Sequence, residues 1–286
     1  MTNPREPTQV LEDKRVLVTG AGAGLGRAYA THAAQSGAQV GINDIDPERA
    51  ETVSKELLDL GLAVVALPGD MSDWDDSERI VGVLVKELGR IDGIVSNAGI
   101  LHVCKPWEDT GPAISRLVRV NLLGVLFGGI HAMRHMVEQD SGSIVNIVSG
   151  SQMGLPGMGA YGASKGGVAS ATYSWALDLV GTGVKVNAFS PLAQTNMGVE
   201  WRRPGPETRP PLPMPDVCAP VVSYLLSDLS DGIRGQVLRL EGEELSILHH
   251  PSIPDLRIRR DSWTVEDIAA AIEGPLEGEL RHVGRD

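Results

Sequence analysis

Residues 15–26 read RVLVTGAGAGLG, and this stretch decides the fold. Arg15 to Thr19 has the β-branched and apolar pattern of a short buried strand, and the helical pattern of Arg27 to Ser36 follows the glycines. Glycine suits this turn because the chain must bend tightly, approach a bound phosphate and pack a helix closely on a strand. The helix N-terminus adds unpaired N–H groups and a positive dipole end. The stretch predicts a strand-turn-helix unit that holds a pyrophosphate; a tight turn without a ligand is the alternative.

The alternation of short β-branched runs with longer helical patterns continues from residue 15 to about residue 240. This alternation is typical of βαβ units and of a parallel sheet covered by helices on both faces. The helix predicted over Pro47 to Leu60 has Asp46 as its N-cap and Pro47 at its first position. The predicted strands are Arg15 to Thr19, Gln39 to Asn43, Ala63 to Pro68, Gly93 to Ser96, Ser143 to Ser149, Lys185 to Phe189 and Gln236 to Leu240. We therefore expect an α/β fold, with one Rossmann-like, doubly wound sheet of seven parallel strands.

Two segments interrupt this rhythm. Pro204 to Pro215 (PGPETRPPLPMP) predicts a stiff surface loop because proline continues neither a helix nor a central strand; a PxxP ligand for another protein is the alternative. After Gly242 the pattern changes, and Thr264 starts a predicted helix with an apolar face from Ile268 to Ile272. The expected organisation is an N-terminal arm of residues 1–13, an α/β domain of residues 14–242 and a C-terminal extension of residues 243–286.

Composition and charge exclude several classes of protein. The chain of 286 residues has 42% hydrophobic and 22% charged residues, which is ordinary globular composition. Its net charge of −12 opposes binding to nucleic acid and to anionic membranes. Cys104 and Cys218 provide neither a disulfide framework nor a structural zinc site. Residues 1–14 lack the apolar run of a signal peptide, and the apolar stretch Val120 to Ile130 is too short to span a bilayer. We expect a cytoplasmic protein without nucleic-acid or membrane partners.

An acidic residue after the second predicted strand indicates which dinucleotide is bound. Asp44 lies 20 residues beyond Gly24, where a carboxylate can accept hydrogen bonds from both hydroxyls of an adenosine ribose. The same carboxylate would repel a 2'-phosphate, and no Lys or Arg lies between Val40 and Pro47. The sequence therefore predicts NAD over NADP; a solvated acid at a strand end is the alternative. The cofactor contacts expected in this part of the chain are Gly20, Gly24, Leu25, Gly26, Asp44, Asp70 (at the adenine edge), Met71, Asn97, Ala98 and Gly99.

Tyr161 and Lys165 lie four residues apart on a predicted helix, so their side chains share one face. A lysine charge about 5 Å away, at an effective dielectric near 20, would lower the pKa of a phenol by roughly 2 units. Ser149 ends the fifth predicted strand, where ligands sit in open α/β sheets, and we prefer it to the competing hydroxyl of Ser151. Asn121 interrupts an apolar helix, where its amide needs partners. The alternatives are an exposed i,i+4 pair, a serine that caps a turn, and an asparagine that only satisfies neighbouring backbone.

These residues together carry a resemblance to a known family. Thr19 to Gly26, Asn97-Ala98-Gly99, Asn121, Ser149, Tyr161-x-x-x-Lys165 and Asn187 to Pro191 resemble the short-chain dehydrogenase/reductase family over about residues 12–242. The resemblance implies hydride transfer between a nicotinamide cofactor and a secondary alcohol or ketone. It implies Tyr161 as general acid/base, Lys165 on the nicotinamide ribose, Ser149 on the substrate oxygen and Asn121 at a relay water. It also places Pro191, Leu192 and Thr195 beside the nicotinamide.

The chain departs from the family pattern in two places. The usual Pro-Gly after the sixth strand is Pro191-Leu192 here, and the usual Asp-Gly-Gly near the last strand is Glu241-Gly242-Glu243. Within the family, the chain is similar to the (3R)-hydroxyacyl-CoA dehydrogenase part of peroxisomal multifunctional enzymes. This similarity rests on TGAGAGLGRAYA from Thr19, Asn43-Asp44, and VCAPVVSYLL from Val217.

Partners and substrate follow less directly from the sequence. The glycine-rich helix from Gly159 predicts close packing against another subunit, and the resemblance implies a homodimer or homotetramer; an internal contact is the alternative. Arg202, Arg203 and Arg209 suit the phosphates of a 3-hydroxyacyl-CoA or 3-ketoacyl substrate, or simply form a solvated loop face. One alternative is that the substrate is a steroid, a terpenoid or a simple alcohol. Another is that the protein is a non-catalytic dinucleotide sensor. His249-His250 lacks a clear third ligand nearby, so no metal site is expected.

Overall fold

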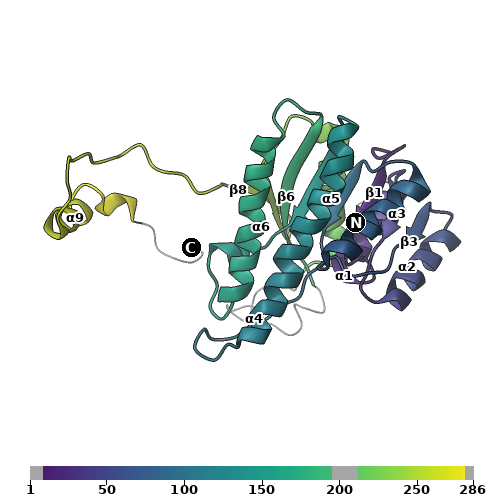
Figure 1. Cartoon of the computed structure of the whole chain (residues 1–286), viewed down its shortest axis with the longest axis horizontal. Coiled ribbons are helices and arrows are strands. Elements are labelled where there is room, and N and C mark those ends of the chain that lie inside the picture. The colour runs from purple at the N-terminus through teal and green to yellow at the C-terminus, as the bar shows by residue number, and fades with distance from the viewer. Residues whose placement is uncertain (1–8, 195–211, 281–286) are drawn as a thin grey trace.

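A single eight-stranded sheet forms the centre of the molecule (Figure 1). The computed structural model describes residues 9–194 and 212–280. The strand order is β3-β2-β1-β4-β5-β6-β7-β8, so the direction of winding reverses between β1 and β4. The strands are β1 (Arg15–Val18), β2 (Gln39–Ile42), β3 (Val64–Ala66), β4 (Gly93–Ser96), β5 (Gly142–Ile147), β6 (Val184–Leu192), β7 (Val237–Glu241) and β8 (Glu244–Leu248). All seven predicted strands are confirmed, with ends that differ by up to three residues.

The last strand corrects the prediction of seven parallel strands. The first seven strands pair in parallel, but β8 runs antiparallel to β7 and pairs with all five of its residues. Gly242, at φ +62°, and Glu243 join the two strands in a two-residue hairpin, for which a positive φ is typical. Leu245 and Ile247 of β8 alternate with polar residues, which is the period of a strand. The sheet therefore continues to Leu248, beyond the domain boundary expected at Gly242.

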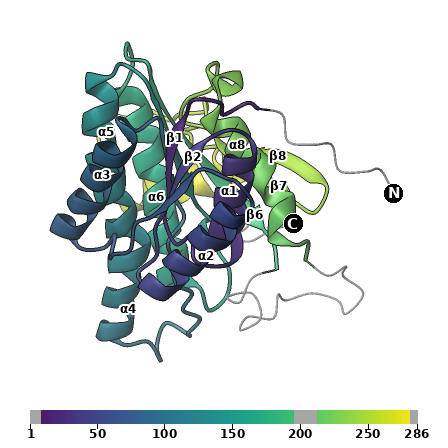
Figure 2. The ribbon, with the colours of Figure 1, turned by 90° about the vertical axis from the view of Figure 1, so that its right-hand side faces the viewer.

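Helices cover both faces of the sheet (Figure 2). One face packs against α1, α2 and α8, and the opposite face against α3, α5 and α6. The helices are α1 (Gly24–Gln35), α2 (Pro47–Asp59), α3 (Trp74–Leu88), α4 (Gly111–Val118), α5 (Gly124–Glu138), α6 (Gly159–Asp178), α8 (Ala219–Leu226) and α9 (Val265–Ile272). The predicted N-cap of α2 is confirmed, because Asp46 accepts hydrogen bonds from the N–H groups of Glu48 and Arg49. The doubly wound α/β architecture is thus as expected.

The glycine-rich turn after β1 brings α1 very close to the strand ends. Gly20 has φ +62°, a left-handed conformation that glycine adopts without strain. A Cβ on Gly26 would lie 2.1 Å from Gly20 O, so any side chain there would push the helix away from the turn. The helix begins at Gly24, three residues earlier than predicted. The close packing of helix on strand required by the sequence is therefore present.

A π-helical turn, η1 (Arg119–Leu123), joins α4 to α5 and makes one continuous helical run from Gly111 to Glu138. By length and composition this run is apolar enough to cross a membrane, although it packs against α3 and α6. Only a third of its most apolar window is buried. Ile114 and Val137 of this run are exposed, so part of its apolar surface stays uncovered.

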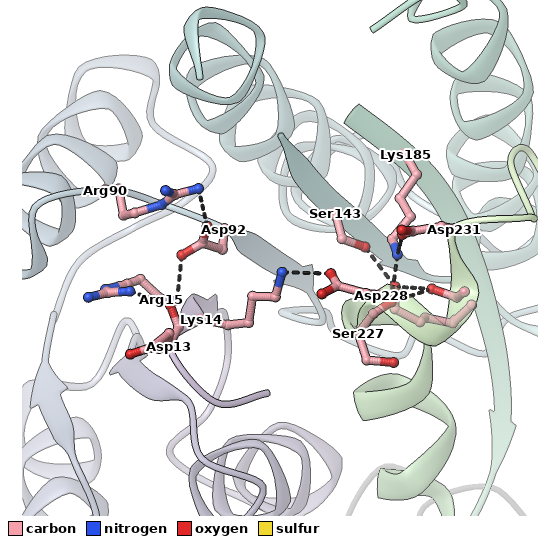
Figure 3. A network of polar contacts seen from close by, with 12 residues as sticks. Asp13, Lys14, Arg15, Arg90, Asp92, Ser143, Lys185, Ser227, Asp228 and Asp231 are labelled. Atoms are coloured by element: carbon pink, nitrogen blue, oxygen red, sulfur yellow. Dashed lines mark hydrogen bonds and ion pairs between the residues drawn. The ribbon is translucent and has the colours of Figure 1, made fainter. Parts of the chain in front are cut away.

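The amino ends of the strands are joined by ion pairs, far from the strand ends that carry the predicted site (Figure 3). Lys14 Nζ bonds Asp228 at 2.6 Å, and the buried Lys185 Nζ bonds Asp231 at 2.7 Å. Asp92 accepts from the backbone N–H of Arg15 at 2.9 Å. These groups line a polar cavity of about 180 Å³. These charges pair with one another, and the ion pairs stabilise the amino ends of the strands.

The two appendages behave differently. In the N-terminal arm Leu11 is fully buried and its N–H bonds Ser36 O at 2.9 Å, so the end of the arm belongs to the core. Beyond β8, residues 249–280 lie away from the sheet (Figure 1). Their helix α9 starts where predicted, with Thr264 and Asp267 forming a capping box. Of the proline-rich segment, residues 204–211 lie outside the described part of the chain.

Candidate active site

The carboxyl ends of the parallel strands bring the predicted site residues to one edge of the sheet. Thr19, Asp44, Asn97 and Ser149 each follow the end of a different strand. Such an edge, next to the reversal between β1 and β4, is where open α/β sheets bind ligands. The fold therefore assembles the site at this edge of the sheet.

Tyr161 and Ser149 face each other across the site. Tyr161 lies in the first turn of α6, and a side-chain hydrogen bond joins it to Ser149. Burial raises the pKa of Tyr161 above its ordinary value, and the bond to Ser149 only partly opposes this. The sequence predicts that this pKa is lowered. For the chain without a bound cofactor this prediction is wrong, because burial raises the pKa and has the larger effect.

Ser149 has a second role that the sequence had left open. Its hydroxyl accepts a hydrogen bond of 3.2 Å from the N–H of Ser151 and so caps the short helix η2 (Gly150–Met153). The competing hydroxyl of Ser151 is buried and has no hydrogen-bond partner within residues 9–194 and 212–280. Gln152 Oε1 is likewise buried and unpartnered in that part of the chain. The preference for Ser149 as the partner of Tyr161 agrees with this geometry.

Lys165 is almost completely buried one turn after Tyr161. Its Nζ donates a hydrogen bond of 2.8 Å to Ile147 O, at the end of β5. Burial lowers the pKa of Lys165 to about 8, since a low-dielectric surrounding disfavours the charged form. An exposed surface pair with Tyr161, the alternative reading, is wrong.

Asn121 sits in the π-helical turn η1 and is fully buried. Its Oδ1 accepts from the N–H of Ile100, and its Nδ2 donates to Ile100 O, both at 2.8 Å. A Cβ on Gly99 would lie 3.3 Å from Asn121 Oδ1 and 3.7 Å from Lys165 Nζ, so Gly99 separates these two groups. The amide of Asn121 thus satisfies neighbouring backbone and fixes the chain after β4.

Thr19 and Asn97 lock the glycine-rich turn to the end of β4. The Thr19 hydroxyl accepts from the N–H groups of Asn97 and Ala98, at 2.9 and 3.0 Å, and donates to Val95 O. Asn97 Nδ2 donates to Thr19 O at 2.9 Å. Short polar contacts therefore hold residues 97–99 against the glycine-rich turn.

Asp44 is buried against the glycine-rich turn. Its Oδ2 accepts from the N–H of Gly22 at 3.0 Å, and its Oδ1 from the N–H of Asp46 at 3.1 Å. A Cβ on Gly22 would lie 2.7 Å from Arg49 Cβ, so the stem of Arg49 borders the same place. This cation lies just beyond residues 40–47, in which no Lys or Arg is present, and it pairs with Asp46 at 3.2 Å.

Two further predicted cofactor contacts, Asp70 and Met71, also have contacts within the chain. Asp70 Oδ1 accepts from both the N–H and the hydroxyl of Ser72, at 2.8 and 2.7 Å, and so stabilises the start of α3. Met71 is a buried core residue, and its Cε would lie 2.7 Å from a Cβ on Gly128. Its side chain therefore belongs to the core.

The N-terminus of α1 fits the phosphates of a dinucleotide. No side chain in the described part of the chain caps this helix, so its first N–H groups, near Gly24 and Leu25, lack an acceptor from a side chain. A Cβ on Gly24 would meet open space, so the backbone there is accessible. Together with Asp44 these groups match a pyrophosphate and a ribose. Pro191 and Leu192 form the half-buried end of β6, and Thr195 lies outside the described residues.

Arg239 is a buried cation at this edge that sequence reasoning missed. It donates to Ser190 Oγ at 2.9 Å and to Glu241 at 2.7 Å. A Cβ on Gly150 would lie 2.7 Å from Arg239 Nη1, so the guanidinium supports the turn that follows Ser149. The sequence feature that could have identified it is the position of an arginine between Leu238 and Leu240, in an otherwise apolar strand.

Comparisons with known proteins agree with this geometry. The family model described as short chain dehydrogenase matches residues 14–204. The chain is 35% identical to the 3-oxoacyl-(acyl-carrier-protein) reductase FabG of Thermotoga maritima, over 81% of this chain and 98% of that protein. A short chain dehydrogenase from Mycobacterium avium superposes with a TM-score of 0.82 at 27% identity, over 97% of both chains. A gluconate 5-dehydrogenase from Burkholderia cenocepacia, solved with NADP and tartrate, gives 0.76 at 27% identity, over 82% of this chain and 96% of that chain.

Proposed function

The chain belongs to the short-chain dehydrogenase/reductase family of NAD(P)-dependent oxidoreductases that act on alcohols and ketones, and we propose that Tyr161 exchanges the proton of its reaction. The observation that carries this is the hydrogen bond between the half-buried side chains of Tyr161 and Ser149, beside a buried Lys165. Because burial raises the pKa of Tyr161, the phenol holds its proton at neutral pH and is ready to donate it to a ketone oxygen.

The neighbouring groups have separate tasks in this proposal. Ser149 donates a hydrogen bond to the substrate oxygen, and Lys165 provides a positive charge next to the phenol when an alcohol must give up its proton. The side-chain atoms of Asn121 already bond Ile100, so a relay water near Asn121 would use its main-chain carbonyl. A bound nicotinamide supplies the hydride acceptor or donor of this chemistry.

We propose NAD rather than NADP as the cofactor. Asp44 lies at the end of β2 with its carboxylate against Gly22, where it can accept from ribose hydroxyls and repel a 2'-phosphate. The structure with NADP from Burkholderia cenocepacia belongs to another protein of the same fold, so the choice for this chain depends on its own residues. Arg49 is the group that opposes this preference.

For the substrate we propose a 3-oxoacyl or 3-hydroxyacyl thioester as the first class to test. The support is the 35% identity with an acyl-carrier-protein reductase over nearly its whole length. Arg202, Arg203 and Arg209, which would meet the phosphates of CoA, lie outside the described residues. A sugar acid, a steroid and a simple alcohol are the competing classes for the same panel.

We also propose that the protein is a homodimer or homotetramer. The glycines of α6 do not support this, because Gly162 faces Ser151 O and Gly167 faces Leu122 of the same chain. The support is the apolar helical run from Gly111 to Glu138, which exposes Ile114 and Val137 in one chain. A second copy would cover it.

The decisive experiment is turnover of a substrate panel by the wild type and by Tyr161→Phe. We expect the variant to bind NADH as the wild type does but to lose at least about 100-fold in kcat, since proton transfer typically contributes 100- to 10,000-fold. Tyr173→Phe, on the same helix but packed against His250, is the matched control and should keep full activity. Equal activity of Tyr161→Phe and wild type would refute the role of Tyr161, and binding of NADH without turnover of any substrate would indicate a dinucleotide sensor.

A further inference from the structure

The loop between β4 and α4 gathers three side chains of different chemistry. His102, Cys104 and Asp109 each offer one potential metal ligand, and these three atoms all lie within 4.8 Å of one another. His102 Nε2 and Asp109 Oδ1 are 2.8 Å apart. All three residues are partly shielded from solvent. None of them belongs to the proton-transfer group around Tyr161.

The backbone that carries these side chains is held in place by hydrogen bonds. The N–H of Cys104 donates to Gly157 O at 2.8 Å. Asp109 Oδ1 also accepts from the N–H of Thr110 at 2.8 Å, and Thr110 is the N-cap of α4. Because two of the three groups are fixed to neighbouring elements, the cluster is pre-arranged by the fold.

The set of donor atoms is the one that zinc prefers. An imidazole nitrogen, a thiolate sulfur and a carboxylate oxygen are the usual ligands of this ion, and sites with three protein ligands keep a fourth position for water. Tetrahedral bonds of about 2.0 to 2.3 Å place neighbouring ligand atoms roughly 3.5 Å apart. The cluster spans 2.8 to 4.8 Å and therefore reaches that geometry through small side-chain movements.

The charge of the cluster also favours a divalent cation. Thiolate and carboxylate together carry two negative charges, which one divalent ion balances. A bound cation would replace both the thiol proton and the hydrogen bond between His102 and Asp109.

We propose that His102, Cys104 and Asp109 form a site for one divalent transition-metal ion of the zinc class, with solvent as its fourth ligand. The site lies on the loop that leaves Gly99 and contacts Gly157, four residues before Tyr161. The ion fixes the wall of the active site, and it takes no part in proton or hydride transfer.

Cobalt and zinc binding to the full-length protein test this proposal. After treatment with a chelator and dialysis, we expect one Co²⁺ to bind per chain, with a thiolate-to-cobalt charge-transfer band that one equivalent of Zn²⁺ abolishes. Cys104→Ser should remove the band, and His102→Gln and Asp109→Asn should weaken binding by at least about tenfold, because even outer partners of a metal site cost that much. Cys218→Ala changes the other, buried cysteine and should bind cobalt normally.

The test is independent of the proposed enzyme activity. Tyr161→Phe should bind Co²⁺ as the wild type does, whatever its turnover. Circular dichroism of each variant checks that a loss of binding is not a loss of folding. Absence of the charge-transfer band in the wild type, or binding that His102→Gln and Asp109→Asn leave unchanged, would overturn the proposal.

Discussion

Asp44 and Arg49 give the cofactor site two opposite charges within a few ångströms of Gly22. The carboxylate is held by two backbone N–H groups, at 3.0 and 3.1 Å. The guanidinium of Arg49 is exposed and pairs with Asp46. Since Asp44 is fixed and Arg49 has freedom to move, the wild type should favour the ribose hydroxyls of NAD.

Replacing Asp44 by Ala should therefore relax the preference for NAD. We expect the KM for NAD to rise by roughly 10- to 100-fold, because hydrogen bonds to charged groups contribute about 1.5 to 3 kcal/mol. NADP should become a comparable cofactor, since the carboxylate that repels the 2'-phosphate is gone and Arg49 is near enough to attract that phosphate. The double variant Asp44→Ala, Arg49→Ala should lose this gain. Steady-state kinetics with both cofactors measure these effects, and a wild type that prefers NADPH would contradict the argument.

The buried charge of Lys165 lowers the free energy of unfolding by an amount that depends on pH. Its pKa of about 8 is below the ordinary value of 10.5, so the unfolded chain binds this proton more tightly. Stability should therefore rise between pH 8 and 10.5, and the full penalty of roughly 3 kcal/mol applies below pH 8. Lys165→Met removes the charge and one hydrogen bond worth about 1 kcal/mol, so it should gain roughly 2 kcal/mol at pH 7.

Urea unfolding of Lys165→Met and wild type at pH 7 and 9.5 measures this effect. The gain should shrink at the higher pH, while turnover is lost at both. The exposed Lys55 provides the control, since Lys55→Met should change stability little at either pH. A variant less stable than the wild type at pH 7 would show that the buried charge is compensated.

The sequence identifies which side chains meet at the site but not what each one touches. The spacing of Tyr161 and Lys165 and the position of Ser149 after a strand correctly predict that they come together. The pairing of Asn121 with Ile100, and of Lys165 with Ile147 O, depends on how α5, α6 and β5 pack. Such packing brings residues together that are distant in the chain, and no local pattern records it.

Among the elements, those with a strong period and clear end signals are the ones that sequence predicts well. The helix α2, with Asp46 and Pro47, ends within one residue of its predicted limit. The strand β8 was missed because Gly242-Glu243 looked like the end of the pattern, although this pair forms the turn of a hairpin. The glycines of α6 were assigned to another subunit, whereas Gly162 and Gly167 meet groups of the same chain. A glycine in a helix indicates that another group approaches the backbone closely, but it does not show whether that group belongs to the same chain or to another subunit.

Two of the apolar surfaces of the whole molecule are candidates for contact with a second copy. One is the helical run from Gly111 to Glu138, and the other is the extension, where Val265 and Ile268 of α9 are 78% and 52% exposed. The superposition with the protein from Mycobacterium avium covers 97% of both chains, which leaves too few residues uncovered to omit residues 249–280. The similarity therefore includes most of the extension, and a second copy of the chain is the partner we propose for it.

Light scattering at micromolar concentration should give two or four times the chain mass of 30.4 kDa. A chain that ends at residue 250 keeps β8 and should associate more weakly, and Ile268→Glu should have the same effect because it puts a charge into an apolar contact. Glu266→Gln, on the polar side of α9, is the matched control. A monomeric wild type would disprove the oligomer, and an unchanged mass of the shortened chain would disprove the role of the extension.

The π-helical turn η1 has a consequence for exchanging segments between relatives. A turn of this kind holds one residue more than an α-helical turn, so deleting a single residue from Arg119–Leu123 would restore a regular helix. Because the wide turn takes up the extra residue, the faces of α4 and α5 would then keep nearly the same relative orientation, whereas deleting a residue inside α5 would rotate the part before it by about 100°, since an α-helix has 3.6 residues per turn. Chimeras of this protein therefore tolerate a difference of one residue in length here better than within α4 or α5, provided that Asn121 is kept.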